Sequence, residues 1–395
     1  MYDFAVIGAG IAGASVAFEL AQVGTVAVIE AESEAGYHST GRSAALYTPN
    51  YGNDVVRAIN AGSGPFFVDP PSGFANHPLL TPRGLLTIAG PGQEARLDTI
   101  VATAADDAPV HHMAATKALA LVPLLRPEVV AAAAYEPGVM DIDVDALHQA
   151  YLRAFKALNG LLICNARVRR IYRHRGKWVI EVADSTIQAA IVINAAGAWA
   201  DEIGAMAGAR TLGLVPKRRS AIVAEAPVGM NIQSLPAVDM ACSEAYLKPE
   251  AGRIMASFGD ETPTEPQDAQ PEELDIALAA DWLQRHTIID VRRIAHSWAG
   301  LRTFVSDGAP VVGFDGALDD FFWLAAQGGY GIMMGPALAK ASKSLIQHNR
   351  LPDDFEQRGV SQSAISPARL SEVRSRSVIE SSTDGSTRGR RSQPI

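Results

Sequence analysis

The segment at residues 2–30, YDFAVIGAGIAGASVAFELAQVGTVAVIE, decides the fold. Residues 2–7 and 26–29 are short apolar runs typical of buried strands, and residues 14–22 have the composition of a helix. The turn GAGIAG at residues 8–13 separates the first strand from the helix. The order strand, glycine turn, helix, strand predicts a βαβ unit and therefore an α/β fold.

The spacing of the three glycines indicates a nucleotide site. Gly8 permits a tight turn, Gly10 lets the backbone approach a pyrophosphate, and Gly13 lets the helix pack closely on the strand. The helix N-terminus adds amide donors and the positive end of the helix dipole. Glu30 closes the second strand, where a carboxylate accepts hydrogen bonds from ribose hydroxyls. Glycine turns are common, so it is the strand, the helix and Glu30 together that predict a Rossmann-like nucleotide-binding domain.

Two later turns of small residues favour FAD over NAD. The apolar run at residues 189–194 leads into AAGAWAD at 195–201, and GGYG at 328–331 precedes a helix expected from about 334 to 347. A helix N-terminus facing a flavin would stabilise the negative charge that reduction places there. Each turn, taken alone, is equally compatible with a structural turn that packs between a strand and a helix and binds no ligand.

Composition limits the classes of partner. The chain has 395 residues, of which 48% are hydrophobic and 19% charged, which is typical of a folded α/β protein of two domains. A net charge of -9 argues against nucleic acid and favours small molecules. Cys164 and Cys242 lie in no disulfide or metal-binding pattern, so no metal is expected. No apolar run is long enough for a transmembrane segment and a strand follows Met1 closely, so we expect a cytoplasmic protein.

The pattern along the chain predicts a discontinuous first domain. Residues 1–80, 141–215 and 296–370 are assigned to it, with a helix that begins at Asp143 or Asp145 and strands at 161–168, 178–182 and 321–325. Residues 81–140 and 216–295, with short β-like runs and an acidic, proline-rich stretch at 260–275, are expected to form a second, substrate-binding domain. Residues 371–395 are rich in Arg and Ser without an apolar period and are expected to be a disordered tail.

Together with residues 8–30, the segments YHSTGRSAA (37–45), WAGLR (298–302), DGAP (307–310) and GGYG (328–331) resemble the D-amino-acid oxidase superfamily of FAD-dependent oxidoreductases. The resemblance covers about residues 1–370. Within the superfamily the chain is similar to the bacterial D-arginine dehydrogenases at DIDVDALHQ (141–149), PKRRS (216–220) and YLKP (246–249). It implies an α/β (α+β overall) fold, in which a Rossmann-like FAD-binding domain of the glutathione-reductase type carries an antiparallel-sheet substrate domain.

The resemblance also implies which residues bind the cofactor. Relatives with covalently attached flavin use Cys or His, and no cysteine lies in the C-terminal part of this chain, so FAD is expected to be non-covalent. The expected FAD contacts are Gly8, Gly10, Ala12, Gly13, Glu30, Ala31, Ser39, Thr40, Gly41, Arg42, Ser43, Ala44, Val168, Ala196, Gly197, Gly328, Gly329, Tyr330, Gly331 and Ile332.

Five residues are placed around the substrate by the same resemblance: Tyr51, Arg219, Tyr246, Arg302 and the Gly329 backbone. Their chemistry agrees, because an arginine fork binds a carboxylate through two parallel hydrogen bonds and a tyrosine hydroxyl adds a neutral donor. For Arg302, which lies in an apolar stretch, the alternative is a buried structural ion pair. For Arg219, which has two basic neighbours, the alternative is a solvated surface charge. No histidine is required as a base, because hydride can leave the alpha carbon once the substrate amine is neutral.

The substrate side-chain pocket is expected at Leu46 and Leu85. The D-arginine dehydrogenases have a histidine and a glutamate at these positions, so the two leucines depart from their pattern. A guanidinium in an apolar pocket would lose its solvation without compensation. We therefore expect small or apolar side chains in place of arginine.

The sequence thus predicts FAD-dependent oxidative deamination of a D-amino acid. Hydride transfer from the alpha carbon to flavin would give an imino acid that hydrolyses to a 2-oxo acid and ammonia. The alternatives are the same fold acting on glycine, an N-methyl amino acid or a 2-hydroxy acid, and a flavin subunit of an electron-transfer complex. The electron acceptor, whether quinone, oxygen or another molecule, stays open.

Overall fold

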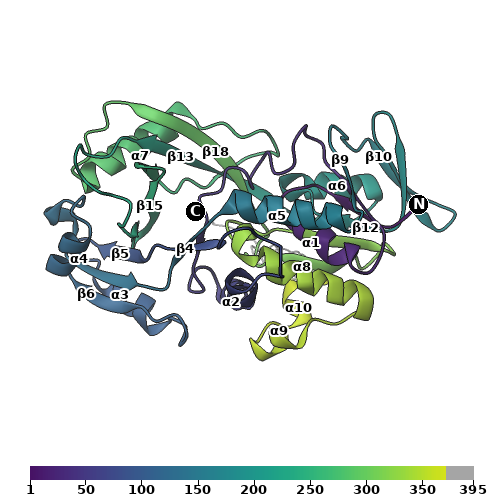
Figure 1. Cartoon of the computed structure of the whole chain (residues 1–395), viewed down its shortest axis with the longest axis horizontal. Coiled ribbons are helices and arrows are strands. Elements are labelled where there is room, and N and C mark those ends of the chain that lie inside the picture. Colours follow the sequence, from purple (N-terminus) through teal and green to yellow (C-terminus); the bar gives the residue numbers. More distant parts are fainter. Residues whose placement is uncertain (371–395) are drawn as a thin grey trace, which may run out of the picture.

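The computed structural model describes residues 1–370, which form two large sheets and a small one (Figure 1). The eight-stranded sheet lies on the right of Figure 1, with β1 (Tyr2–Ile7) at its centre, and the nine-stranded sheet lies on the left. The expected tail at 371–395 lies outside the described residues. No helix within residues 1–370 has the length and apolar character needed to cross a membrane, and no three His, Cys, Asp or Glu side chains there are grouped for a metal ion.

The eight-stranded sheet has a parallel centre with antiparallel strands at its margins. The five parallel strands, in order, are β9 (Leu161–Ile163), β2 (Val26–Ile29), β1, β12 (Thr186–Asn194) and β20 (Phe321–Ala325). Parallel strands are covered on both faces, which explains the apolar sequences of β2 and β20 and of the buried part of β1. The antiparallel strands are β19 (Val311–Phe314) beside β20, and β11 (Lys177–Glu181) and β10 (Arg170–His174) beside β12.

Most of the expected strands of this sheet are confirmed. Residues 2–7, 26–29 and 321–325 are strands with the expected bounds. The strand expected at 161–168 was too long, and β9 ends at Ile163. Asn165 has a φ of 53°, which an extended strand does not accommodate.

Helices cover one face of this sheet. The long ones are α1 (Ile11–Ala21), α2 (Asp54–Val68), α5 (Val144–Ala157) and α8 (Gly331–His348). Their apolar faces share one core, in which Val16, Tyr151 and Leu338 are buried. Asp143 is the N-cap of α5, because its Oδ1 accepts a hydrogen bond from the Ala146 amide at 2.9 Å. Both α1 and α8 begin three residues earlier than expected, since each glycine turn already forms the helix N-terminus.

The nine-stranded sheet is antiparallel, as expected, except at one pair of strands. β14 and β5 run parallel, and all its other neighbouring strands are antiparallel. These two strands come from distant segments, so no hairpin forces them to be antiparallel. In order, the strands are β17 (Thr262–Pro263), β13 (Val215–Ala224), β16 (Arg253–Ser257), β15 (Ser243–Glu250), β14 (Ala237–Met240), β5 (Leu85–Ala89), β7 (Ala132–Glu136) and β6 (His111–Ala114), and β18 (Ile294–Phe304) pairs with β13.

The division into domains stays a prediction. β18 begins about where the first domain is expected to resume, yet it pairs along its length with β13 of the nine-stranded sheet. The small sheet has the strands β3 (Leu46–Tyr47), β8 (Met140–Ile142) and β4 (Leu80–Pro82). The remaining helices are α3 (Ala95–Ala102), α4 (Ala115–Leu121), η1 (Pro127–Val129), η2 (Gly197–Trp199), α6 (Ala200–Ala207), α7 (Glu273–His286), α9 (Asp353–Gln357) and α10 (Gln362–Ile365).

Candidate active site

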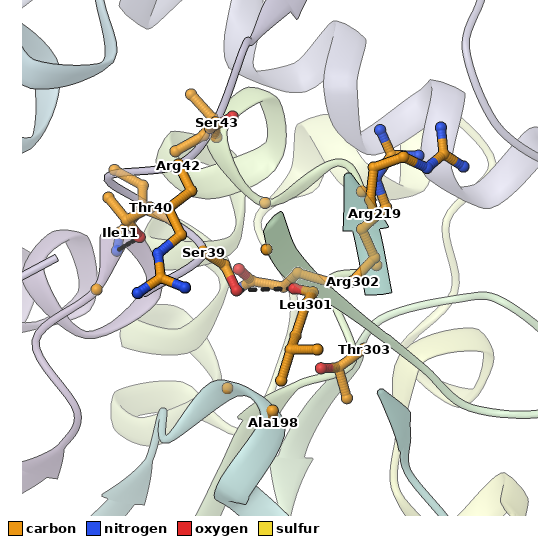
Figure 2. Close-up of a pocket in the computed structure, with 18 of the residues that line it drawn as sticks. Ile11, Ser39, Thr40, Arg42, Ser43, Ala198, Arg219, Leu301, Arg302 and Thr303 are labelled. Carbon is orange, nitrogen blue, oxygen red and sulfur yellow. Dashed lines mark hydrogen bonds between the residues drawn. The ribbon is translucent and has the colours of Figure 1, made fainter. Parts of the chain in front are cut away.

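A cavity lies at the carboxyl ends of β1, β2, β12 and β20 and has two adjoining parts that share Gly10, Thr40 and Gly197. The part next to Glu30, here called the β2 side, also contacts Val168. The part next to the nine-stranded sheet, here called the β18 side, is the subject of Figure 2. The carboxyl ends of parallel strands are where open α/β sheets bind their ligands.

The first glycine turn has the geometry that a pyrophosphate needs. Gly8 has a φ of +97°, and a Cβ on it would lie 2.5 Å from the Ala195 carbonyl oxygen. A Cβ on Gly13 would lie 1.8 Å from the Gly8 carbonyl oxygen, so only glycine permits this approach of helix to turn. The Ile11 amide of α1 donates to Thr40 Oγ1 at 2.9 Å, the N-cap residue Gly10 has no side chain to offer, and no acidic residue lies in the first turn. The positive end of α1 therefore faces the cavity and favours an anion.

Glu30 is held at the edge of the cavity by the backbone. It is 9% exposed, and its carboxylate accepts hydrogen bonds from the amides of Ala9 at 2.7 Å and Glu32 at 2.9 Å. A carboxylate has acceptor sites beyond these two, so Glu30 can still bind ribose hydroxyls. On the same side, His38 lies 4.6 Å from the Trp199 ring, and both contact the cavity. Sequence reasoning singled out neither ring for the site, since no local pattern marks this pair.

The N-terminus of α8 meets that of α1 at the β18 side. Gly328 has a φ of +54°, and its amide donates to the Thr303 carbonyl at 2.9 Å, which ties the turn to β18. A Cβ on Gly329 would lie 3.0 Å from the Arg302 guanidinium carbon, so glycine leaves room for that side chain. A Cβ on Gly331 would lie 3.8 Å from Ile11 of α1. Two helix N-termini therefore contribute to one cavity.

Arg219 and Arg302 lie beside each other at the β18 side (Figure 2). They come from the adjacent antiparallel strands β13 and β18, where Gly300 is the direct partner of Arg219. Arg219 is 7% exposed, and its Nε donates to the Asp260 carbonyl at 2.8 Å. Its Nη1 is buried without a hydrogen-bond partner. Burial, with the neighbouring Arg302, lowers the pKa of the Arg219 guanidinium.

These surroundings decide between the alternatives for the two arginines. The low exposure of Arg219 rules out a solvated surface charge. Arg218 contacts Asp275 Oδ2 at 3.0 Å through its Nε. Arg219 contacts Glu261 Oε1 at 3.3 Å through its Nη2, which leaves its Nη1 as the nitrogen without a partner. Within the described part of the chain, no carboxylate lies within ion-pair distance of Arg302. Two desolvated guanidinium groups, one with an unpaired nitrogen, form a site for an anion.

The tyrosines extend this group of donors. Tyr246 lines the cavity. Tyr51 is not among the lining residues; its ring lies 5.0 Å from that of Tyr330, and its hydroxyl donates to Glu244 at 3.2 Å. Burial raises the pKa of Tyr51, so this hydroxyl stays protonated at neutral pH. Burial works to lower the pKa of Arg302, but Tyr51 and Tyr246 outweigh it and the pKa lies above its usual value. The Arg302 guanidinium therefore stays positively charged at neutral pH.

Most of the expected site residues line the cavity. Those that do are Gly8, Gly10, Ala12, Glu30, Ala31, Ser39, Thr40, Arg42, Ser43, Ala44, Val168, Ala196, Gly197, Gly328, Gly329, Gly331 and Ile332, with Arg219, Tyr246 and Arg302. Those that do not line it are Gly13, Gly41, Tyr330, Tyr51, Leu46 and Leu85. Leu46 lies opposite Asp141 on β8 and Leu85 opposite Glu136 on β7. The contacts expected of all these residues with FAD and substrate stay predictions.

Several lining residues were missed. Trp298 and Gly300 precede Arg302 at intervals of two on β18, so strand alternation could have found them. The loop at 37–45 is tied to β18, because Ser39 Oγ donates to the Leu301 carbonyl at 2.7 Å (Figure 2) and Arg42 Nη1 to the Ala299 carbonyl at 3.1 Å. Only the tertiary structure could reveal these contacts.

Two helix N-termini, a glycine turn and a buried carboxylate at the strand ends, facing a donor-rich sheet, define a FAD-binding oxidoreductase. The chain belongs to the FAD dependent oxidoreductase family, DAO, whose model matches residues 3–345. FAD is accordingly its cofactor.

Comparison with curated proteins gives distant relatives. Glycine oxidase of Geobacillus kaustophilus is 24% identical over 251 residues, which are 62% of this chain and 64% of the relative. Mitochondrial dimethylglycine dehydrogenase of Mus musculus is 26% identical over 257 residues, which are 60% of this chain and 29% of the relative. The chain thus spans less than two thirds of each of these relatives.

Solved structures share the whole fold. Glycine oxidase of Geobacillus kaustophilus superposes with a TM-score of 0.77 at 21% identity, covering 91% of this chain and 98% of that one. L-alpha-glycerophosphate oxidase of Mycoplasma pneumoniae with FAD bound has a TM-score of 0.77 at 16% identity, with coverage of 87% and 94%. L-amino acid deaminase of Proteus vulgaris has a TM-score of 0.77 at 12% identity, with coverage of 93% and 97%. These similarities establish the fold.

We expect purified protein to be yellow and to release all of its flavin when denatured by acid or heat. The residues that line the β18 side include no cysteine or histidine, the side chains that attach flavin covalently in some relatives. The measurement is visible absorbance of the filtrate and of the washed pellet. A yellow pellet would contradict non-covalent binding.

Proposed function

We propose that the protein oxidises a D-amino acid with a small or apolar side chain. The alpha carbon loses a hydride to FAD, and the resulting imino acid hydrolyses to a 2-oxo acid and ammonia. The observation that carries the proposal is the pair of arginines Arg219 and Arg302, which line the cavity beside the Gly328–Gly331 turn; the Nη1 of Arg219 is buried and has no hydrogen-bond partner.

The arginine pair suits a carboxylate better than other anions of similar size. A guanidinium fork matches the two oxygens of a carboxylate, and each charge-assisted bond is roughly twice as strong as a neutral one. Tyr246 adds a hydroxyl donor from the neighbouring part of the sheet. A carboxylate held here lies close to the Gly329 turn, which packs against Arg302. This arrangement would fix the alpha carbon relative to the cofactor.

The chain's own residues favour hydride loss over base-catalysed proton abstraction. The residues that line the β18 side include no histidine, aspartate or glutamate that could take a proton from the alpha carbon. FAD supplies the hydride acceptor when bound. The protein's own role is then to hold the substrate carboxylate, to orient the alpha hydrogen toward the flavin and to bind the substrate with its amine in the neutral form.

Two sources support the substrate class. The relatives named above include a glycine oxidase and a dimethylglycine dehydrogenase, whose names point to small amino acids. The D configuration is proposed from the resemblance to D-arginine dehydrogenases, and the small side chain from the names of these relatives. Leu46 and Leu85 lie outside the lining of the cavity and do not carry this part of the proposal. Glycine itself is the second candidate, favoured by the glycine oxidase relative.

Anaerobic mixing with single substrates tests the proposal. The panel contains D- and L-alanine, D- and L-norvaline, glycine, N-methylglycine and D- and L-lactate, and the readout is bleaching of the flavin absorbance. We expect D-amino acids to react roughly a hundredfold faster than their L-enantiomers, because a misplaced reacting atom costs about that factor. Bleaching by L-amino acids or lactates alone would refute the proposal.

A further inference from the structure

The turn between β20 and α8 places a glutamine at the cavity in a strained stretch of backbone. Gln327 follows Ala326, which has a φ of 56°, and precedes Gly328, which has a φ of +54°. The left-handed region is costly for a residue with a Cβ, so Ala326 stays there because its surroundings fix it. Ala326 is 3% exposed and, like Gln327, lines the β18 side of the cavity. The strain at Ala326 therefore accompanies the placing of Gln327 at the cavity.

The Gln327 side chain lies where the N-termini of α8 and α1 meet. A Cβ on Gly331, the first residue of α8, would lie 2.9 Å from Gln327 Oε1 and 3.8 Å from Ile11 of α1. The positive end of a helix favours an oxygen, which explains why Oε1 is the side-chain atom nearest to Gly331. The amide nitrogen is then the end of the carboxamide that remains for another partner.

No atom of residues 1–370 accepts a hydrogen bond from this nitrogen. Gln327 Nε2 is buried and has no partner in the described part of the chain. An amide nitrogen that is buried without an acceptor is costly. Such an atom at the lining of a binding cavity therefore indicates a bound group that supplies the acceptor.

The place of the nitrogen separates the cofactor from the substrate. Arg302 contacts the turn at Gly329, where a Cβ would lie 3.0 Å from the guanidinium carbon, and this is the region proposed for the substrate carboxylate. Gln327 contacts the turn at Gly331, beside the N-terminus of α1, which has the geometry for a pyrophosphate. A group that lies between these two helix N-termini is the cofactor, whose flavin ring has oxygen and nitrogen acceptors.

We propose that Gln327 donates a hydrogen bond through Nε2 to the flavin of FAD and thereby raises the reduction potential of the cofactor. Reduction leaves negative charge on the flavin, and a donor that contacts the ring stabilises this charge more than it stabilises the neutral oxidised ring. Gln327 thus helps to set how readily the cofactor accepts a hydride. This role requires bound FAD but no particular substrate, so it goes beyond the proposed oxidation of a D-amino acid.

Two substitutions remove the donor from the holoenzyme. Gln327→Met has a side chain of similar length without an amide. Gln327→Glu keeps the shape of glutamine, with one oxygen still able to face Gly331, and replaces the donor with a negative charge. Gln347→Met is the matched control, because Gln347 is an exposed glutamine at the opposite end of α8. FAD content and melting temperature show whether each variant is folded.

The readout is the midpoint potential of the bound flavin, measured without substrate by stepwise reduction with dithionite against a reference dye. We expect Gln327→Met to shift the ratio of oxidised to reduced flavin roughly tenfold toward the oxidised form, which lowers the potential by about 30 mV for a two-electron couple. Gln327→Glu should lower the potential further, because its carboxylate repels the charge of the reduced ring. Gln347→Met should keep the wild-type potential.

The outcomes that overturn this role do not depend on the substrate. A wild-type potential in either Gln327 variant with full FAD would show that Nε2 does not donate to the flavin. Loss of FAD from both Gln327 variants, with Gln347→Met intact, would assign Gln327 to holding the cofactor and would also overturn its role in the potential. If no D-amino acid bleaches the flavin of the wild-type protein, the proposed function falls, whereas the potentials still decide the role of Gln327, since dithionite replaces the substrate.

Discussion

Arg302→Leu is expected to keep its FAD and to lose most of its activity. Removing one partner of a desolvated charged pair costs about 2 to 5 kcal/mol, which corresponds to a loss of roughly thirtyfold to several thousandfold in kcat/KM for the best amino acid. Arg302 lines the β18 side of the cavity and has no carboxylate of the described chain to pair with, so its charge is available for a substrate carboxylate. Steady-state kinetics with an artificial electron acceptor measure the loss.

Two further variants make the result specific. Arg302→Lys keeps the charge without the bidentate fork and should lie between Arg302→Leu and wild type. Arg292→Leu removes an exposed arginine that precedes β18, whose pairing with Asp290 at 2.7 Å is entirely on the surface, and should change neither kinetics nor flavin content. If Arg302→Leu retains near wild-type kcat/KM, Arg302 is a structural residue and the substrate carboxylate is bound elsewhere.

Gly13→Ala is expected to purify with little FAD and with a lowered melting temperature. The added Cβ would meet the Gly8 carbonyl oxygen at 1.8 Å and its carbon at 2.9 Å, and both atoms belong to the backbone of the first glycine turn. That turn has no room to move away, since Gly8 packs closely on Ala195 from the other side. The helix must therefore shift off the strand, at a cost of roughly 1 to 3 kcal/mol or more, and its N-terminus leaves the position that serves the pyrophosphate.

A second glycine supplies the matched control. Gly62 lies within α2, and a Cβ there would meet the Ala337 Cβ at 3.6 Å and the Arg358 side chain at 3.9 Å, which are ordinary van der Waals contacts. Gly62→Ala should keep full flavin and raise stability, because alanine is favoured over glycine in a helix by about 1 kcal/mol. Flavin absorbance per chain and thermal unfolding compare the two variants. Full flavin content and an unchanged melting temperature in Gly13→Ala would show that the turn adapts.

The first thirty residues could be interpreted without the structure because their requirements are local. Gly8 must adopt a positive φ and Gly13 must touch the turn, and both conditions act within a few residues of chain. The strands β1 and β2 follow from short apolar runs that are typical of buried parallel strands. The N-cap of α5 is equally local, since the Asp143 side chain reaches only to Ala146. The end of β9 escaped sequence reasoning because nothing in the apolar pattern marks the left-handed Asn165.

The assignment of the substrate site depended on the tertiary structure. Lys217, Arg218 and Arg219 look equivalent as a sequence, and only the pairing of β13 with β18 turns Arg219 toward the cavity and Arg218 toward Asp275. The neighbours of Tyr246 in the sheet follow from the hairpin register of β14 and β15, and the place of β14 beside β5 follows from a parallel pairing between segments about 150 residues apart. Turn geometry and helix capping are encoded within a few residues of the chain, whereas the register between distant strands is set by the packing of the whole sheet, and that register decides which side chains share a cavity.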